Sequence, residues 1–255
     1  MGDGLVVSLT PYVHLASESL AGIGPGATIR VDPRARHHLD RVLRLQAGAR
    51  IEVADGGGRE APAILGDGTV VVDGPVIVHD PADVALHLLQ ALPKGRKCDD
   101  VIRSATELGV DVITVVVSAR TQGRPDADRG PRLRERWVDV ARAAAEQSRR
   151  PWLPEIHGLV TLQEALASLA TPAVGVIGHP DASMTIRAAL AQAGRPTGGS
   201  VVGAVGPEGG WTAEEVEAMT AAGLQPATLG AFTLRTEHAG FALCTVLAFY
   251  LGRMG

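Results

Sequence analysis

Hydrophobic and polar residues follow two different patterns along this 255-residue chain, and the pattern changes near residue 83. Before the change, short β-type runs are separated by Gly and Asp turns, which is typical of a small β-rich domain. These runs cover residues 27–31, 49–56, 59–65, 69–74 and 75–79.

One stretch within this region has a helical period instead. A helix over residues 33–44 would place Leu39, Val42 and Leu43 on an inner face and most of its Arg residues on the outside. The sequence therefore predicts one short helix with a basic outer face in the first domain.

After residue 83, apolar strands alternate with helices, which is the pattern of a mostly parallel α/β sheet. The predicted strands cover residues 84–92, 112–117, 173–178 and 201–206. The predicted helices cover residues 98–108, 131–147 and 236–251, and a further helix follows the capping box of Thr161 and Glu164. Residues 79–83 have the composition of a linker, so we predict two domains, residues 1–80 and 81–255.

Composition and net charge exclude few classes of function. The net charge of −4 does not indicate a nucleic-acid-binding protein, so such a function depends on local clusters of basic residues. One cluster is present, because residues 30–50 contain six Arg and two Asp. On its own, such a cluster is typical of a solvated helix face, whereas in a protein that binds nucleic acid it would suit phosphate contacts.

Cysteine content and the N-terminus point to a reducing compartment. Cys98 and Cys244 both lie in apolar, helix-like runs, so we expect buried thiols and no metal site. The N-terminal residues 1–15 lack the pattern of a secretory leader, and no apolar run reaches the roughly 18 residues of a membrane span. We therefore expect a cytoplasmic protein without membrane association.

A glycine-rich loop follows the strand at residues 201–206. The loop reads Gly-Pro-Glu-Gly-Gly over residues 206–210, and a capping box of Thr212 and Glu215 then starts a helix. Such a loop is either a plain strand-to-helix turn or a site where backbone amides approach a ligand. Its late position and spacing differ from the dinucleotide-binding fingerprint, which disfavours a nicotinamide-dependent oxidoreductase.

A second polar segment lies between Leu229 and Ala239, at the start of the final apolar helix. Thr236 as a helix cap and Glu237 at the positive helix end would explain two of its residues. Arg235 stays unexplained, because a cation at a helix N-terminus is unfavourable without an anion or a substrate to pair with it.

These two segments resemble the RsmE group of SPOUT RNA methyltransferases. The group has GPEGG followed by LG-x-x-x-LRTE at the start of the last helix, and the segments 92–97, 107–109 and 146–150 occur in the expected order. The resemblance implies an α/β fold, with a small N-terminal PUA-like β-barrel and a SPOUT-type C-terminal domain that contains a trefoil knot. It also implies a homodimer.

The resemblance further implies transfer of a methyl group from S-adenosylmethionine to N3 of a uridine in 16S ribosomal RNA. The substrate would be that RNA or the assembled small ribosomal subunit. The residues that would bind the cofactor are Gly178, His179, Gly203, Gly206, Pro207, Glu208, Gly209, Leu229, Gly230, Leu234 and Thr236.

For catalysis, Arg235 is the candidate for orienting and stabilising an anionic uracil. Glu237 is the candidate proton acceptor, with Glu208 or His238 as alternatives, although a carboxylate would need a raised pKa for this role. Candidate RNA-binding residues are Arg34, Arg36, His38, Arg41, Lys94, Arg96, Lys97 and Arg150.

The chain departs from the family pattern at three positions. Ala119 replaces an acidic residue, Phe232 replaces Arg, and His238 replaces Thr or Ser. These three departures leave the identity of the target base undecided, so a SPOUT enzyme acting on another nucleotide remains an alternative. A non-catalytic RNA-binding protein is a weaker one, because it would not need the glycine-rich loop and Arg235 together.

Overall fold

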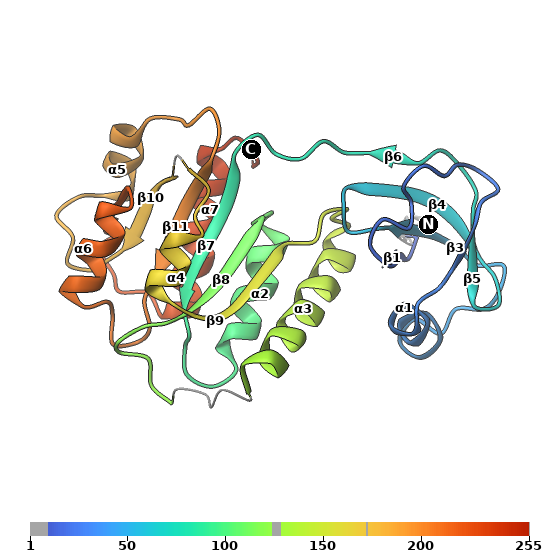
Figure 1. The fold of residues 1–255 in the computed structure, drawn as a ribbon, viewed down its shortest axis with the longest axis horizontal. Coiled ribbons are helices and arrows are strands. Elements are labelled where there is room, and N and C mark those ends of the chain that lie inside the picture. Colours follow the sequence, from blue (N-terminus) through green and yellow to red (C-terminus); the bar gives the residue numbers. More distant parts are fainter. Residues whose placement is uncertain (1–9, 124–128, 172, 255) are drawn as a thin grey trace, which may run out of the picture. The chain divides into compact units, whose positions relative to one another are not determined.

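The computed structural model describes residues 10–123, 129–171 and 173–254 (Figure 1). The prediction about a secretory leader concerns residues 1–15, of which residues 1–9 lie outside these ranges. The chain divides into two compact units, one of residues 1–81 with 145–153 and the other of residues 82–144 with 154–255.

The first unit is built on a six-stranded sheet with the order β1-β3-β4-β5-β2, and β6 pairs with β4. β1 runs parallel to β3, and the other neighbouring strands are antiparallel. The core of the unit contains Val13, Ile51, Val53 and Val70, which are at most 1% exposed. The strands are β1 (Tyr12–His14), β2 (Thr28–Arg30), β3 (Arg50–Ala54), β4 (Arg59–Leu65), β5 (Thr69–Val72) and β6 (Ile77–Val78).

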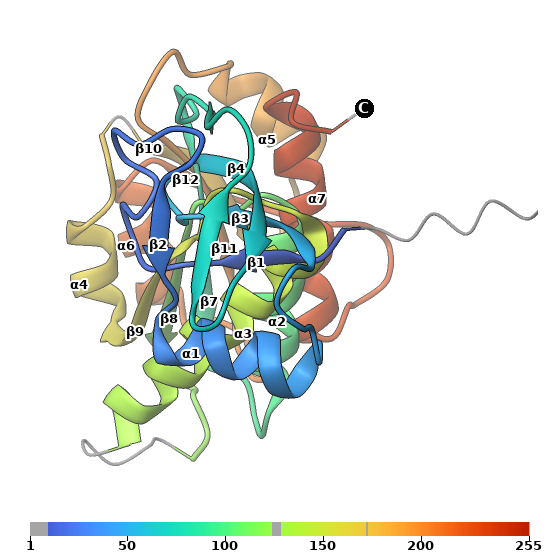
Figure 2. The ribbon, with the colours of Figure 1, turned by 90° about the vertical axis from the view of Figure 1, so that its right-hand side faces the viewer.

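The predicted helix over residues 33–44 is in fact two shorter segments, α1 (Pro33–His37) and the π-helix η1 (His38–Val42). α1 lies at the end of β2 (Figure 2). Asp32 caps α1 by accepting hydrogen bonds from two backbone amides at 3.0 Å. Leu39 is buried as predicted, but Val42 is 60% exposed. A π-helix has more residues per turn than an α-helix, so the α-helical period placed Val42 on the wrong face.

Residues 145–153 return to the first unit, which the sequence pattern did not indicate. Arg149 donates a hydrogen bond to the carbonyl of Thr10 at 2.8 Å, forms an ion pair with Glu52 and lies over the ring of Tyr12. The Trp152 ring occupies the place where Gly58 would carry a Cβ. Residues 145–153 therefore pack against parts of the first unit that are distant from them in sequence.

The second unit contains a parallel six-stranded sheet with the order β12-β10-β11-β7-β8-β9, which confirms the predicted α/β architecture. All four strands predicted in this region are present, and β9 and β12 are additional. The strands are β7 (Ala85–Ala91), β8 (Val112–Val117), β9 (Glu155–Thr161), β10 (Ala173–Gly178), β11 (Ser200–Val205) and β12 (Leu224–Ala227).

Helices cover both faces of this sheet (Figure 1). One apolar core joins the sheet to α2, α3, α5 and α7, and the other joins it to α4 and α6. Alternate residues of β7 serve the two cores, with Leu86 and Leu88 on one side and Leu89 on the other. The helices are α2 (Lys97–Glu107), α3 (Arg129–Ser148), α4 (Leu162–Ala167), α5 (Ile186–Ala193), α6 (Ala213–Ala221) and α7 (Thr236–Tyr250).

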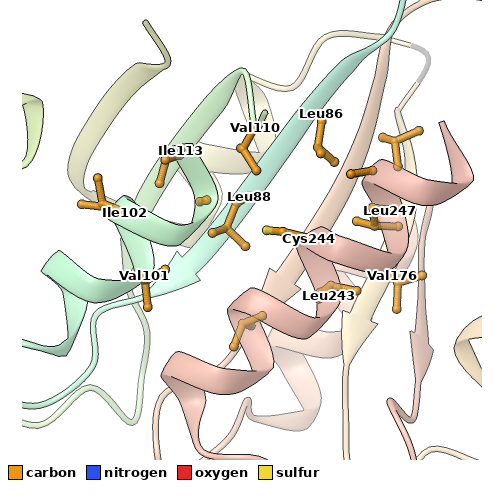
Figure 3. Packing of buried hydrophobic residues seen from close by; sticks show 14 of the residues in the cluster. Leu86, Leu88, Val101, Ile102, Val110, Ile113, Val176, Leu243, Cys244 and Leu247 are labelled. Atoms are coloured by element: carbon orange, nitrogen blue, oxygen red, sulfur yellow. The ribbon is translucent and has the colours of Figure 1, made fainter. Parts of the chain in front are cut away.

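Helix α7 packs its inner face onto the centre of the sheet. Figure 3 shows Leu243, Cys244 and Leu247 among buried residues of β7 and α2, and each is at most 1% exposed. Both cysteines are buried free thiols, as predicted, and burial raises the pKa of Cys244 to about 12. α7 is thereby fixed with its N-terminus near the carboxyl ends of the central strands.

Candidate active site

A cavity of about 510 Å³ lies in the second unit, where the chain leaves the carboxyl ends of β10 and β11. Loops that follow parallel strands meet at one edge of the sheet, which is where α/β proteins bind ligands. Its volume falls within the range of about 300–1,000 Å³ found for ligand pockets. Three segments form most of the cavity wall: Gly178–Pro180, Val205–Glu208 with Gly210, and Thr228–Thr236. Lys97 from α2 and Ala239 from α7 complete it.

The 206–210 loop forms one wall and needs its glycines for different reasons. A Cβ on Gly206 would lie 3.3 Å from the backbone of Gly210, and Gly210 has a φ of +70°. The amide of Gly210 donates to the carbonyl of Pro207 at 2.8 Å, which closes the turn. The predicted capping box of Thr212 and Glu215 follows, with both hydrogen bonds present.

Arg120 supports this loop from outside the cavity and was not identified from the sequence. Its guanidinium donates a hydrogen bond to the carbonyl of Gly209 at 2.8 Å, and a Cβ on Gly209 would lie 3.3 Å from that of Arg120. The backbone amide of the preceding residue, Ala119, donates a hydrogen bond to the carboxylate of Glu215 at 2.8 Å. Both hydrogen bonds are present although position 119 has Ala instead of the acidic residue of the family pattern.

The predicted cofactor-binding residues are mostly brought together. Two of them are not part of the wall, because Gly203 lies within β11 and faces Leu243 and Leu247, and Gly209 faces Arg120. A Cβ on Gly203 would lie 2.9 Å from Leu243, so this glycine allows close packing of α7 on the sheet. Those that line the cavity are Gly178, His179, Gly206, Pro207, Glu208, Leu229, Gly230, Leu234 and Thr236.

Thr236 connects two walls of the cavity instead of capping α7. The N-cap is Arg235, whose side chain forms no capping hydrogen bond, and Thr236 is the first helical residue. The Thr236 hydroxyl donates to the carbonyl of Gly206 at 2.7 Å and accepts from the amide of Gln90 at 3.0 Å. Gln90 is fully buried on β7, where His87 is the other polar residue. A polar residue near the carboxyl end of a mostly apolar strand is the signal that could have identified Gln90.

An ionic cluster lies beside this neutral connection. The ammonium of Lys97 is 3.2 Å from a carboxylate oxygen of Glu208 and 3.2 Å from one of Glu237. Glu208 also accepts a hydrogen bond from the backbone amide of Lys94 at 3.2 Å.

The two carboxylates of this cluster are held in the charged form. Burial opposes the charge on each, but their own backbone amides and the Lys97 ammonium outweigh burial and keep the pKa of Glu208 and of Glu237 below the usual range. A carboxylate base that works near neutral pH needs the opposite shift. A lowered pKa makes either carboxylate a weaker proton acceptor near neutral pH.

Arg235 lies exposed on the cavity wall, and its guanidinium forms no ion pair with any residue in the described ranges. Phe232, on the same wall, is 87% exposed. An unpaired guanidinium beside a ligand-sized cavity is consistent with a site that meets an anionic or carbonyl-bearing group.

Comparisons with known proteins agree with this arrangement. The RNA methyltransferase domain family matches residues 80–248, and the RNA methyltransferase PUA domain family matches residues 31–73. The chain belongs to the RNA methyltransferase family. The ribosomal RNA small subunit methyltransferase E of Synechocystis is 35% identical over 84% of this chain and 70% of that protein. That of Mycobacterium bovis is 32% identical over 90% of this chain and 87% of that protein.

Solved structures of two methyltransferases have the same fold. A methyltransferase from Legionella pneumophila, solved with bound S-adenosylmethionine, has a TM-score of 0.83 at 27% identity and covers 94% of this chain and 98% of its own. The ribosomal RNA small subunit methyltransferase E of Neisseria gonorrhoeae, also bound to S-adenosylmethionine, has a TM-score of 0.78 at 27% identity with the same coverage.

The predicted RNA-binding residues of this methyltransferase differ in their charge environment. Arg36 pairs with Asp40 at 3.4 Å and Asp67 at 3.1 Å, and His38 lies 3.6 Å from Glu146. Arg34, Arg41, Lys94 and Arg96 are exposed, Arg150 is half-buried, and Arg96 lies 3.8 Å from Asp99.

Two features are absent from residues 10–123, 129–171 and 173–254, the part of the chain that the structure describes. No helix in it is long and apolar enough to span a bilayer. No group of three or more His, Cys, Asp or Glu residues in it is arranged to hold a metal ion.

Proposed function

We propose that the protein transfers a methyl group from S-adenosylmethionine to N3 of a uridine in 16S ribosomal RNA of the small subunit. The observation that carries the proposal is the cavity built by the 206–210 loop and residues 228–236 in a chain of the RNA methyltransferase family. Relatives named as ribosomal RNA small subunit methyltransferases, and solved relatives with bound S-adenosylmethionine, support the substrate and the cofactor.

The residues of the cavity are suited to this cofactor. Leu229, Leu234 and Val205 offer an apolar surface for an adenine ring, while the backbone of the 206–210 loop offers polar groups at close range because two of its glycines leave room. We propose that Gly178, His179, Leu229, Gly230 and Leu234 hold the cofactor together with this loop.

When bound, S-adenosylmethionine would supply an electrophilic methyl group, and the remaining tasks fall to the protein. N3 of uridine must lose its imide proton, and the base then carries a negative charge that is shared with its carbonyl oxygens. We propose that Arg235 binds a carbonyl edge through two donors and stabilises this charge, because a guanidinium stays ionised and Arg235 has no competing partner among the described residues.

We assign Glu237 a structural part instead of proton transfer. Its carboxylate is already charged and paired with Lys97, so it favours the positive end of α7 and fixes the position of Arg235 beside it. The proton would then pass to solvent or to His238, which is exposed on the first turn of the same helix.

Two finer features of the fold belong to the same proposal. The chain leaves β12 at the sheet edge and returns to the centre, where Thr236 joins Gly206, and we propose that this segment threads a SPOUT-type trefoil knot. For the first unit we propose a PUA-like β-barrel, which is supported by the PUA family match.

We further propose a homodimer through α7. The helix buries one side on the sheet, yet Phe241, Val246 and Phe249 on its other side are 50%, 36% and 68% exposed. Large exposed apolar side chains on a helix that is otherwise apolar mark an interaction surface, and closed dimers are the commonest way to cover one.

For substrate docking we propose that the basic residues of α1 and η1, with Lys94 and Arg96, contact phosphates of the RNA. Arg34 and Arg41 are exposed there. Such contacts give affinity and orientation, while the methyl acceptor is selected inside the cavity.

Titration calorimetry with S-adenosylmethionine and a labelled-methyl transfer assay with 16S ribosomal RNA test the proposal together. We expect cofactor binding without added metal and transfer of label to the RNA. Binding of NAD in place of S-adenosylmethionine, or cofactor binding with no transfer to either free RNA or small subunits, would contradict it.

A further inference from the structure

Lys97 occupies an unusual place for a surface lysine. It is the first residue of α2, it lines the cofactor cavity, and its ammonium lies 3.2 Å from Glu208 and 3.2 Å from Glu237. Glu208 belongs to the 206–210 loop, which forms one wall of the cavity, and Glu237 belongs to the first turn of α7. One side chain therefore links this wall to the start of α7.

The environment of Lys97 differs from that of a phosphate contact. The side chains of Lys97, Glu208 and Glu237 are 35%, 31% and 16% exposed, and the Glu237 oxygen that faces Lys97 is shielded from solvent. The ammonium donates a hydrogen bond to Glu208 and forms an ion pair with Glu237, whose facing oxygen accepts no hydrogen bond from the described residues. A phosphate would have to compete with two carboxylates that already surround this cation.

The cluster also depends on the lysine for its charge balance. Two carboxylate oxygens lie within 3.2 Å of one nitrogen, so Glu208 and Glu237 are close neighbours whose charges repel unless a cation lies between them. The hydrogen bond from Thr236 to Gly206 connects the same two segments but leaves this repulsion in place.

We propose that Lys97 is a positioning residue that holds the 206–210 loop against the first turn of α7 and thereby sets the shape of the cofactor cavity. The inference rests on the function proposed above, because it is the S-adenosylmethionine site that Lys97 would shape. It also reassigns Lys97, which the sequence pattern grouped with the RNA-binding residues.

The first test measures S-adenosylmethionine affinity by calorimetry in Lys97→Met, Lys97→Arg and the double variant Lys97→Met/Glu208→Gln. We expect Lys97→Met to weaken binding about 10-fold, because two facing carboxylates are left unpaired. Lys97→Arg restores the cation and should recover most of the affinity. The double variant removes the repulsion and should bind better than Lys97→Met alone.

The pH dependence separates this role from a general loss of packing. In Lys97→Met, repulsion raises the pKa of one carboxylate, so the deficit relative to wild type should be small at about pH 5 and grow towards about pH 8. Glu237 also faces His238, and Glu208 also accepts a hydrogen bond from the backbone amide of Lys94. Both groups are present in the two proteins, so the ratio of the two affinities at each pH reports mainly the loss of Lys97.

Arg103→Met is the matched control. Arg103 lies on the same helix and pairs with Asp100 at 2.6 Å, but it is not part of the cavity wall, so its loss should leave cofactor affinity unchanged. Hydrogen exchange gives a readout that needs no cofactor. The amides of residues 206 and 208–210 should exchange faster in Lys97→Met than in Arg103→Met.

Two results would overturn the proposal. One is unchanged cofactor affinity in Lys97→Met together with weaker RNA binding and a lower salt dependence, which is the behaviour of a phosphate contact. The other is unchanged exchange of the amides of residues 206 and 208–210. If wild-type protein bound no S-adenosylmethionine, the proposed function would fail, while the exchange measurement would still decide the part played by Lys97.

Discussion

At the scale of single residues, Arg235 carries the catalytic proposal. We expect Arg235→Ala to lower the single-turnover rate of methyl transfer by about 10²-fold, on the scale of losing one transition-state donor, with little change in cofactor affinity. Arg187→Ala, an exposed Arg on α5 outside the cavity wall, is the matched control. Near-wild-type turnover of the Arg235 variant at saturating RNA and cofactor would remove Arg235 from the mechanism.

The sequence identified many residues of the cavity but not how they are connected. The local sequence favours Thr236 as a helix cap, yet its partners are Gly206 and Gln90, which lie 30 and 146 positions away. The family resemblance favours Glu237 as a base, although Lys97 pairs with it and lowers its pKa, which makes it a weaker base. Local patterns specify residue types near a site, whereas pairings at this sequence separation follow from the fold.

At the scale of elements, continuous apolar runs were the reliable signal. β8 and β10 have the predicted bounds, because strands buried on both faces are apolar along their whole length. β9 and β12 were missed, since Glu155–Thr161 is mostly half-exposed and Leu224–Ala227 is short and contains Pro226.

Close contact between β10 and β11 gives a sharp stability prediction. A Cβ on Gly175 would overlap the backbone carbonyl of Val202, so Gly175→Ala must distort the centre of the sheet. We expect it to lower the free energy of unfolding by about 3 kcal/mol or more, as overpacking of a rigid interior does.

Urea denaturation measures this change, with Gly198→Ala as the control. A Cβ on Gly198 would meet nothing within 4 Å, and its φ is not positive, so the control should stay within about 0.5 kcal/mol of wild type. Equal stabilities of the two variants would show that the two strands do not pack as described.

At the scale of the whole molecule, the return of residues 145–153 to the first unit could not be predicted from sequence. Arg149 makes its contacts with Thr10 and Glu52, which are 139 and 97 positions away. No periodicity or composition shift marks such a return, because the segment simply continues from α3.

The apolar outer face of α7 leads to a prediction about assembly. Replacing Phe241 and Phe249 with Ser should convert a dimer into a monomer in light scattering at micromolar concentration, because the two side chains provide much of the exposed apolar area on the helix. A wild-type protein that is monomeric under these conditions would contradict the proposed dimer.

Charge pairing in the first unit refines the prediction for RNA binding. Arg36 is already paired with Asp40 and Asp67, whereas Arg41 is exposed and has no ion-pair partner in the described structure. Arg41→Ala should therefore reduce the salt dependence of RNA affinity more than Arg36→Ala does. The measurement is the slope of log affinity against log salt, and equal slopes for the two variants would argue against a phosphate contact at Arg41.

The central claim is that this RNA methyltransferase modifies N3 of a uridine in 16S ribosomal RNA. Nucleoside mass spectrometry of 16S ribosomal RNA, before and after incubation with the protein and S-adenosylmethionine, tests it most directly. We predict that N3-methyluridine appears in RNA from cells that lack the gene and that Arg235→Ala strongly slows its formation. A methyl group on a different atom or nucleotide, or no new modification in either free RNA or small subunits, would contradict the account.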